Sequence, residues 1–367
     1  MRNNIDSFSR TNMPEPELLR IGKGPYNIAV DEVSNLVYVA CKKSNTISII
    51  DGNVNSIVRS LKVNSPHDME IDNDRRKIYI IGDNLISVLD TTRKILSPDT
   101  NEPIFDTFDV RSNGRIALDI SKDLIYLLNK FRFDRCINVL DIRNKLSLIK
   151  KININRDPAD IVVGSKTSRI YLANHDSTIT LVNPDQSEII HEIGKPKDIS
   201  KFLGMDSRCK KILVNESENR IYVLYTALKN VPNQGYVFLI TARRAPYVAR
   251  SEVLAIYDSE NYEPMNIIHC PGLNDFCINY LNSETYLVNP DDVSLMILDK
   301  DGVTSHSGIL TEYGNILVSS QAIYLAPPQS PLQFGMGVNT HLHKLYIAIN
   351  GSNGNYLLTY NLDEISL

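Results

Sequence analysis

A short apolar segment centred on tyrosine recurs seven times along the chain, and this repeat constrains the fold more than any other feature. Short apolar runs bounded by polar turns are typical of buried β-strands. Self-similarity at a period of several tens of residues indicates a repeat architecture. The seven copies are LVYVA, KIYII, LIYLL, RIYLA, RIYVL, ETYLV and KLYIA, with their tyrosines at Tyr38, Tyr79, Tyr126, Tyr171, Tyr222, Tyr286 and Tyr346.

A second strand-like segment follows each tyrosine in the same order and ends in Asp or Asn, whose short side chain suits a turn. These ends are Asp51, Asp90, Asp141, Asn183, Asp258, Asp299 and Asn361. In the first repeat an alternating strand from Pro25 and an outer strand over Ser56–Val63 complete a unit of four strands. Such a unit buries both faces only by stacking on its neighbours. We therefore predict an all-β, seven-bladed β-propeller of four-stranded antiparallel blades.

The two ends of the chain predict how the ring closes. The last repeat stops after its third strand, and the isolated segment Leu18–Ile21 precedes the first repeat. We expect this N-terminal strand to close the last blade. The domain organisation is then a polar extension over residues 1–17 and a single propeller over residues 18–367. Helical periodicity is almost absent, and only Asp198–Met205 predicts a helical turn within a loop.

The first repeat, GPYNIAVDEVSNLVYVACKKSNTISIIDG, resembles the YVTN-repeat family of β-propellers. The resemblance covers essentially the whole chain, although the fifth to seventh repeats diverge. It implies the propeller fold. It leaves the function open, because the family includes cell-surface adhesive modules, DNA-binding proteins and relatives of haem-processing or lactone-opening propellers.

Two insertions interrupt the repeat in its second half. One spans about residues 226–252, with Arg243, Arg244 and Arg250, and predicts an extra hairpin on the fifth blade. The other spans about residues 309–331 and contains the sequence PPQSP, which favours an extended chain. A lid, a partner-docking arm and structural filler are three alternatives. We favour interaction with a partner.

Candidate site residues come from the turns that lead into each innermost strand and the turns between second and third strands. Both sets project on one face of a propeller, around the channel mouth, where a His or Asp could move a proton while cations hold an anion. The opposing interpretation is that these are ordinary solvated turn residues. We assign a catalytic role to His67, His175, Asp160 and Arg115. We assign ligand contact to Tyr26, Lys43, Asp68, Arg132, Arg208 and Asp275.

Several chemistries lack their sequence signatures. No Gly-rich phosphate loop, GxGxxG fingerprint, GxSxG elbow or HExxH pair is present. The group His269, Cys270 and Cys277 lacks the close ligand spacing of zinc sites, and we interpret it as coincidence. We therefore predict no cofactor and no metal ligands, while an ion in the central channel stays open because such ions leave little trace in a sequence.

Charge and composition bear on the partners. The net charge is −4, which argues against nucleic-acid binding, although Lys130–Arg135 (KFRFDR) alternates aromatic and charged side chains in a way that suits single strands. No apolar run is long enough to span a membrane, the N-terminus lacks a secretory pattern and the cysteine count of five is odd. We expect a cytoplasmic monomer with reduced thiols and no membrane association.

Two classes of function follow. The first is a non-catalytic scaffold that binds a protein or small ligand at the channel mouth and the fifth-blade insertion. The second is a hydrolase, lyase or isomerase that uses His67 and a facing residue at the mouth. Nucleic-acid binding is the third.

Overall fold

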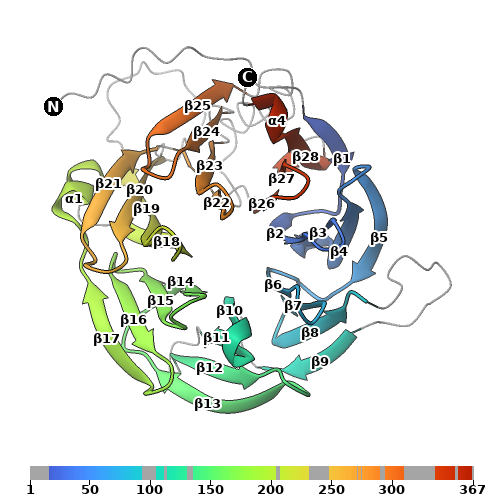
Figure 1. Cartoon of the computed structure of the whole chain (residues 1–367), viewed down its shortest axis with the longest axis horizontal. Coiled ribbons are helices and arrows are strands. Elements are labelled where there is room, and N and C mark those ends of the chain that lie inside the picture. Colours follow the sequence, from blue (N-terminus) through green and yellow to red (C-terminus); the bar gives the residue numbers. More distant parts are fainter. Residues whose placement is uncertain are drawn as a thin grey trace, which may run out of the picture.

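Seven four-stranded antiparallel sheets stand around a central axis in the computed structural model (Figure 1). The structure describes residues 16–92, 105–110, 114–129, 135–203, 207–230, 248–270, 272–273, 275–289, 294–309, 335–351 and 354–365. The predicted fold class, a seven-bladed β-propeller, is therefore confirmed.

Each of the first six blades runs from an innermost to an outermost strand in chain order. Blade one comprises β2 (Pro25–Asp31), β3 (Leu36–Cys41), β4 (Thr46–Asp51) and β5 (Ser56–Lys62). Blade two comprises β6 (Asp68–Asp72), β7 (Lys77–Ile81), β8 (Leu85–Asp90) and β9 (Phe105–Asp109). Blade three comprises β10 (Ile116–Asp119), β11 (Leu124–Asn129), β12 (Cys136–Asp141) and β13 (Ser147–Asn153). Blade four comprises β14 (Pro158–Val163), β15 (Ile170–Asn174), β16 (Ile179–Asn183) and β17 (Glu188–Ile193).

The second half of the ring follows the same order. Blade five comprises β18 (Ser207–Asn215), β19 (Arg220–Asn230), β20 (Val248–Asp258) and β21 (Pro264–His269). Blade six comprises β22 (Asp275–Asn279), β23 (Glu284–Asn289), β24 (Ser294–Leu298) and β25 (Thr304–Ile309). Blade seven comprises β26 (Gly335–Asn339), β27 (Lys344–Gly351), β28 (Gly354–Asn361) and the N-terminal β1 (Glu17–Arg20).

The N-terminal strand closes the ring as the sequence predicts. Strand β1 pairs antiparallel with β28, with Leu18 opposite Leu358 and Arg20 opposite Tyr356. The Ile21 N–H adds a further hydrogen bond to Asn355 O (2.9 Å). Pairing the first strand with the last sheet leaves no free end to the array of blades.

The repeated tyrosines form the constant part of the core, and we call them the anchor tyrosines (Tyr38, Tyr79, Tyr126, Tyr171, Tyr222, Tyr286 and Tyr346). Each lies on the second strand of its blade and is at most 1% exposed. The apolar clusters around them join neighbouring blades; for example, Tyr38 and Ile47 of blade one pack with Ile78 and Ile80 of blade two. The second strands read as continuous apolar runs because both of their faces are buried.

The Asp or Asn after each third strand makes the predicted turn in all seven blades. In blade one, Asp51 Oδ1 accepts a hydrogen bond from the Asn53 N–H (2.8 Å). The other six acceptors, Asp90, Asp141, Asn183, Asp258, Asp299 and Asn361, bind the N–H two residues on in the same way. These are Asx turns, and in blades one, three, four, five and six they lead directly into the outermost strand.

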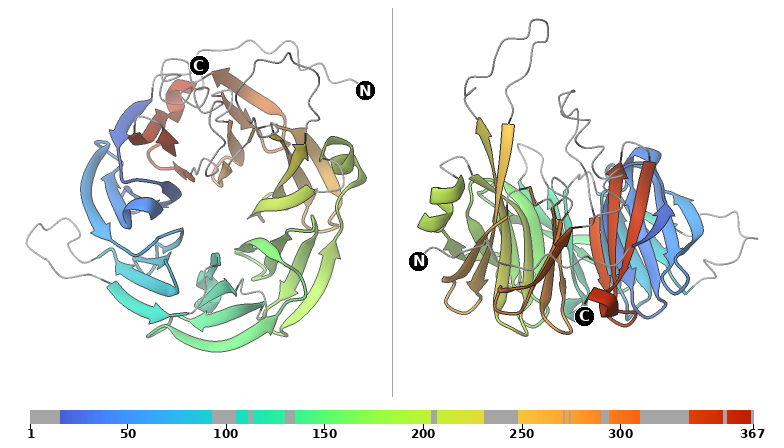
Figure 2. Two further views of the ribbon diagram at one scale, coloured as in Figure 1. Left: turned by 180° about the vertical axis from the view of Figure 1, so that it is seen from behind. Right: turned by 90° about the horizontal axis from the view of Figure 1, so that it is seen from above.

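Blade five departs from the others. Strands β19 and β20 stay paired out to Asn230 and Val248, beyond the length of the other blades, and rise above the ring on the side opposite α4 (Leu362–Ile365; Figure 2). Residues 231–247 and 310–334, which contain Arg243, Arg244 and most of the second insertion, lie outside the described residues. The expected helical turn is α1 (Lys197–Leu203), which buries Ile199 and Leu203 against blade five. Among the described residues, no helix has the length and apolarity to cross a bilayer.

Candidate functional site

One position near the start of each innermost strand varies in charge and size from blade to blade. We call these residues the inner ring, and each lies two residues before the partner of the anchor tyrosine. In blade order they are Asn27, Asp68, Arg115, Asp160, Lys211, Asp275 and Gly335. Four of them, Asp68, Arg115, Asp160 and Asp275, are residues that the sequence pointed to. Acidic and basic side chains alternate along most of the ring.

Asp68 joins the first three blades. Its Oδ1 accepts hydrogen bonds from Asn27 Nδ2 (2.8 Å) and Arg115 Nη1 (3.0 Å), and its Oδ2 accepts from the Ile116 N–H (2.9 Å). The Asp68 side chain is 8% exposed and the Arg115 side chain 27%. A buried carboxylate with three donors is well satisfied, which is the condition for burying a charge.

Asp160 and Lys211 continue the ring into the next blades. Arg115 Nε lies 3.8 Å from Asp160 Oδ1, and the Ile212 N–H donates to Asp160 Oδ2 (3.0 Å). Burial raises the pKa of Asp160, while Arg115 and the Ile212 N–H act in the opposite direction. Lys211 Nζ donates to Asp275 Oδ1 (2.6 Å) and to Phe276 O (2.8 Å) in blade six. The inner ring is thus a series of links that each join one blade to the next.

Gly335 completes the ring by contact rather than by charge. A Cβ atom at this position would lie 3.0 Å from the Asn27 backbone. Real Cβ atoms rarely come this close, so blade seven approaches blade one at the inner ring only because this residue is glycine.

His67 is buried between blades two and three, with 6% of its surface exposed. Its Nδ1 lies 3.1 Å from Ser65 O and its Nε2 lies 3.3 Å from Gly114 O. A neutral imidazole donates to only one of two such carbonyls, whereas an imidazolium donates to both. In this arrangement the ring of His67 ties two blades together. That is a different placement from an imidazole that faces a substrate.

Tyr26 lies half-buried among cations at the mouth. Lys42 Nζ is 5.4 Å and the Arg115 guanidinium carbon 5.6 Å from the centre of its ring, and His67 meets its edge at 6.4 Å. The backbone bonds Lys42 N to Gly24 O (2.9 Å) and Ser44 N to Lys23 O (3.1 Å) hold Lys23, Lys42 and Lys43 together. Within the part of the chain that the structure describes, these three lysines have no acidic partner.

Three other predicted residues lie apart from this network. His175 is exposed on the turn between β15 and β16, and its backbone N–H donates to Asp157 O (2.8 Å). Arg208 is exposed near the start of β18. Arg132 lies outside the described residues, as does the rest of the Lys130–Asp134 segment. The structure therefore brings together Tyr26, His67, Asp68, Arg115 and Asp160, with Lys43 on the neighbouring turn and Asp275 bound to Lys211 further along the inner ring.

Glu70 is a channel residue that the sequence reasoning missed. It is half-buried, and its pKa is raised to about 8 by burial first and then by the charges of Asp68 and Asp160, against the opposing effect of Arg115. It pairs with the anchor Tyr79. The six equivalent residues in the other blades are Ala29, Ala117, Val162, Leu213, Cys277 and Gly337. A comparison of the repeats at this position would have singled out the one carboxyl group.

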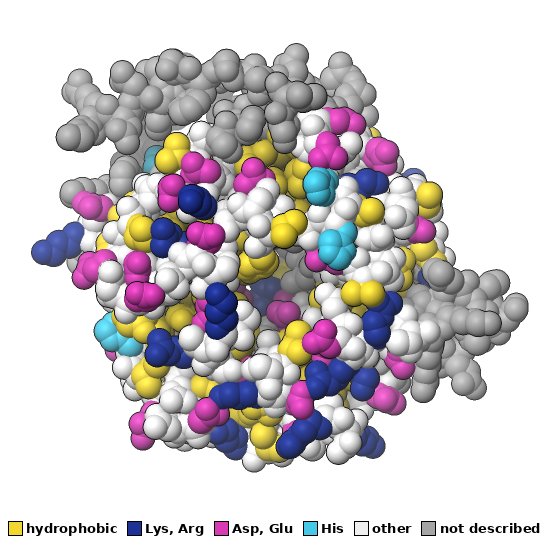
Figure 3. Space-filling view, in the orientation of Figure 1, with side chains coloured by type: hydrophobic (Ala, Val, Ile, Leu, Met, Phe, Trp, Pro, Cys, Tyr) yellow, Lys and Arg dark blue, Asp and Glu magenta, His cyan; other side chains and the backbone are white. Residues whose placement is uncertain are grey.

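Metal ligands do not gather among the residues that the structure covers, where no group of three or more His, Cys, Asp or Glu side chains could hold an ion. Cys270 and Cys277 are buried, and burial raises the pKa of each thiol to about 12. Neither is therefore a thiolate near neutral pH. Figure 3 shows the α4 face of the ring, opposite the blade-five hairpin, where acidic and basic side chains are interspersed around a central hollow.

Comparison with known proteins identifies structures that share the fold but does not assign the chain to a family. No protein-family profile matches the chain. No curated protein matches it in sequence either. Among solved structures, a hydrazine synthase chain from Kuenenia stuttgartiensis superposes with a TM-score of 0.65 at 12% identity, over 98% of this chain and 99% of that one.

Two further structures superpose on most of this chain. Chaetomium thermophilum Raptor matches with a TM-score of 0.68 at 13% identity, over 94% of this chain but 28% of that chain. The β-propeller domain of Myceliophteria thermophila Cps50 (Swd1) matches with a TM-score of 0.61 at 10% identity, over 95% of this chain and 99% of that one. At these identities the similarity shows the shared WD40-like propeller fold alone.

Proposed function

We propose that this propeller is a non-catalytic binding scaffold that engages a protein or small ligand at the channel mouth, with the blade-five hairpin as a second contact. The observation that favours binding over catalysis is the Asp68–Arg115–Asp160 network. The polar groups best placed for chemistry are hydrogen-bonded to one another and to backbone N–H groups of neighbouring blades. Such a network makes a rigid platform, and it leaves these groups little freedom to exchange protons with a substrate.

The chemistry of the ligand follows from the cations at the mouth. Lys23, Lys42 and Lys43 lie together beside Tyr26 without acidic partners among the described residues. The Lys42 ammonium beside the Tyr26 ring, with two more lysines on the adjoining turns, favours a ligand that presents carboxylate or phosphate groups. We therefore propose an anionic group on the protein or small molecule that binds here.

Binding of an acidic peptide tests this proposal. Fluorescence anisotropy with a labelled octaglutamate peptide should show binding that weakens as salt is added, and Lys42→Glu should weaken it about tenfold or more. Lys300→Glu is the matched control, because Lys300 is exposed on a turn after β24, away from the mouth. Equal loss in both variants would mean that only net charge matters, and it would remove the mouth as the site.

An enzyme is the second candidate, and Glu70 is the observation that favours it. A carboxyl group with a pKa of about 8 beside an arginine and two further carboxylates resembles the divided acid–base pairs of hydrolases and isomerases. Carbon-13 NMR of the glutamate carboxyl groups, compared between the wild-type protein and Glu70→Gln, tests the premise. A titration of Glu70 below pH 5 would remove this candidate.

We also propose that the chain is a YVTN-type propeller that functions in a reducing compartment, the cytoplasm. The repeated tyrosine strands and Asx turns support the family. The five cysteines are all buried free thiols, which supports the compartment.

A further inference from the structure

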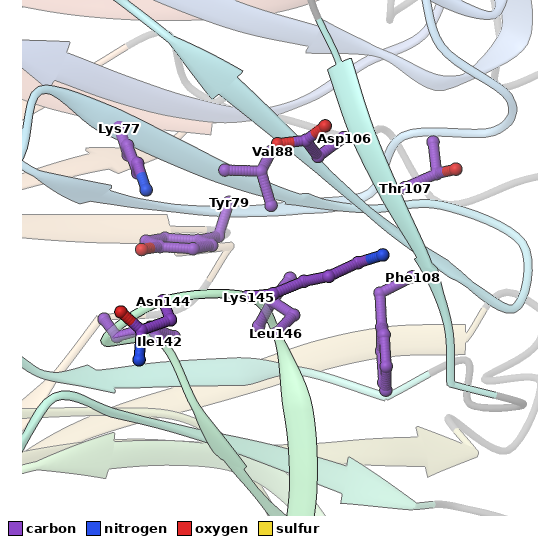
Figure 4. Close-up of a pocket in the computed structure, with 10 residues that line it drawn as sticks. All are labelled: Lys77, Tyr79, Val88, Asp106, Thr107, Phe108, Ile142, Asn144, Lys145 and Leu146. Carbon is purple, nitrogen blue, oxygen red and sulfur yellow. The ribbon is translucent and has the colours of Figure 1, made fainter.

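A cleft opens on the outer side of the ring between blades two and three, away from the channel mouth (Figure 4). Its volume is about 310 Å³. That lies at the lower end of the range of small-molecule sites, about 300–1,000 Å³. Strands β7, β8 and β9 line one side, and the turn over residues 142–146 of blade three lines the other.

The outer strand of blade two differs from its equivalents in how it begins. In blade one the third strand ends at Asp51 and the fourth begins at Ser56, whereas in blade two these positions are Asp90 and Phe105. Blades one, three, four, five and six also have a β-bulge near the start of the outer strand, and β9 pairs with β8 without one in its described residues. A bulge twists and bends its strand. The cleft lies beside this bulge-free stretch of β9, which lines it with Asp106, Thr107 and Phe108.

The side chains give the cleft a polar side and a mixed side. Val88, Phe108 and Leu146 supply apolar surface, and Asp106, Thr107 and the Lys145 amino group lie on the same side as Phe108 (Figure 4). Figure 4 shows the Lys77 amino group, the Tyr79 hydroxyl and the Asn144 amide gathered on the other, polar side. Such a cleft matches a molecule with a compact apolar body and one polar group.

The polar side has unused hydrogen-bonding capacity. The Tyr79 hydroxyl is buried without a hydrogen-bond partner, on a residue that is 1% exposed. Burial raises the pKa of Tyr79 to about 12, so the hydroxyl keeps its proton and can donate it. Among the described residues, Lys77 and the exposed Lys145 have no acidic partner, and Asp106 is the only carboxylate that lines the cleft.

We propose that this cleft binds a small carboxylate with an aromatic or branched apolar body. The carboxylate accepts hydrogen bonds from Lys77 and the Tyr79 hydroxyl, and the body packs on Val88, Phe108 and Leu146. This site is independent of the channel mouth.

The hydroxyls of several other anchor tyrosines also lack hydrogen-bond partners, and this supplies a matched control. Tyr126 is buried to the same degree as Tyr79 in the next blade, and its hydroxyl is also without a partner. Tyr79→Phe and Tyr126→Phe therefore remove the same atom from equivalent positions. Only the first change touches the cleft.

Ligand-observed NMR titration of the full chain with 4-phenylbutyrate tests the proposal. We expect saturable binding of the acid, with the neutral 4-phenylbutyramide and the cationic 4-phenylbutylamine about tenfold weaker. Lys77→Gln and Tyr79→Phe should each weaken the acid about five- to tenfold, whereas Tyr126→Phe and Lys62→Gln, a distant exposed lysine on β5, should leave it unchanged.

Three results would overturn the proposal. The first is the lack of saturable binding of the acid up to about 10 mM, a concentration above the dissociation constant of most specific ligand sites. The second is binding of the amine as tight as that of the acid. The third is equal weakening of acid binding by Tyr79→Phe and Tyr126→Phe. Thermal unfolding of each variant separates a lost site from a lost fold.

Discussion

The anchor tyrosines and the inner ring lie on neighbouring strands of every blade, yet they follow opposite rules. The anchor position holds the same residue in all seven blades, whereas the inner ring changes from Asn27 to Asp68 to Arg115 and onward to Gly335. Each anchor tyrosine fills a similar wedge between two sheets, so one side chain suits all seven sites. Each inner-ring residue must match the particular residue on the next blade.

The difference suggests how a repeat protein keeps its blades in order. The anchor tyrosines are the same in all seven blades, so they do not distinguish one pair of neighbouring blades from another. Links such as Arg115 to Asp68 and Lys211 to Asp275 exist between particular blades only. Specific charge pairs at the axis can thus distinguish blade neighbours that the anchor tyrosines do not.

Removal of an anchor side chain should have the largest effect on stability. Tyr222 is fully buried among Leu224, Leu254 and Phe276 at the junction of blades five and six. Tyr222→Ala leaves a cavity there, and we expect the free energy of unfolding to fall by about 3–5 kcal/mol. Urea unfolding followed by circular dichroism measures it. A loss below about 1 kcal/mol would contradict the role of the anchor positions as the main apolar contacts between blades.

Removal of the Arg115 guanidinium should have the second largest effect on stability. Arg115→Met leaves the carboxylates of Asp68 and Asp160 without their shared counter-charge, and we expect a loss of about 3 kcal/mol in the same assay. Arg143→Met is the control, because its pair with Asp141 is exposed and should leave the unfolding midpoint unchanged. Similar midpoints for both variants would show that the inner ring does not contribute to blade association.

The pH dependence of stability tests the smaller contribution of Glu70. The pKa of Glu70 is about 8 in the folded chain against 4.5 for an ordinary glutamate, so the folded state holds this proton more tightly. The stability that the protonated Glu70 contributes is fully present below about pH 4.5 and is lost as the pH rises towards about 8. At pH 8 we expect the free energy of unfolding of Glu70→Gln to be about 1–2 kcal/mol larger than that of the wild-type protein. This is less than the full pKa shift implies, because water in the channel screens the charge.

A set of urea melts between pH 5 and pH 8 measures this difference, which should grow with pH. Parallel curves for the wild-type protein and Glu70→Gln over that range would mean that Glu70 is ionised throughout.

Removal of an anchor hydroxyl alone should have the smallest effect. The Tyr126 hydroxyl is buried without a hydrogen-bond partner, so Tyr126→Phe removes no bond and we expect a change below about 0.5 kcal/mol. Differential scanning calorimetry measures it. A loss above about 1 kcal/mol would reveal that the hydroxyl has a partner, such as an ordered water between the blades.

The sequence by itself determined the number of blades, their strand order and their closure. Local signals sufficed because each blade repeats the same strands and the same Asx turn, and because Leu18 and its neighbours are the missing strand of the last repeat. The sequence also pointed to Asp68, Arg115 and Asp160, since polar residues at the start of innermost strands are easy to recognise.

Only the tertiary structure decided what those residues do. That Arg115 lies between Asp68 and Asp160, or that His67 faces two carbonyl groups, depends on the distance between blades that are far apart in the chain. The raised pKa of Glu70 and the cleft beside Tyr79 likewise arise from burial and from the packing of one blade on the next. Strand propensity and turn chemistry act within a few residues, whereas these properties depend on contacts that exist only once the ring is closed.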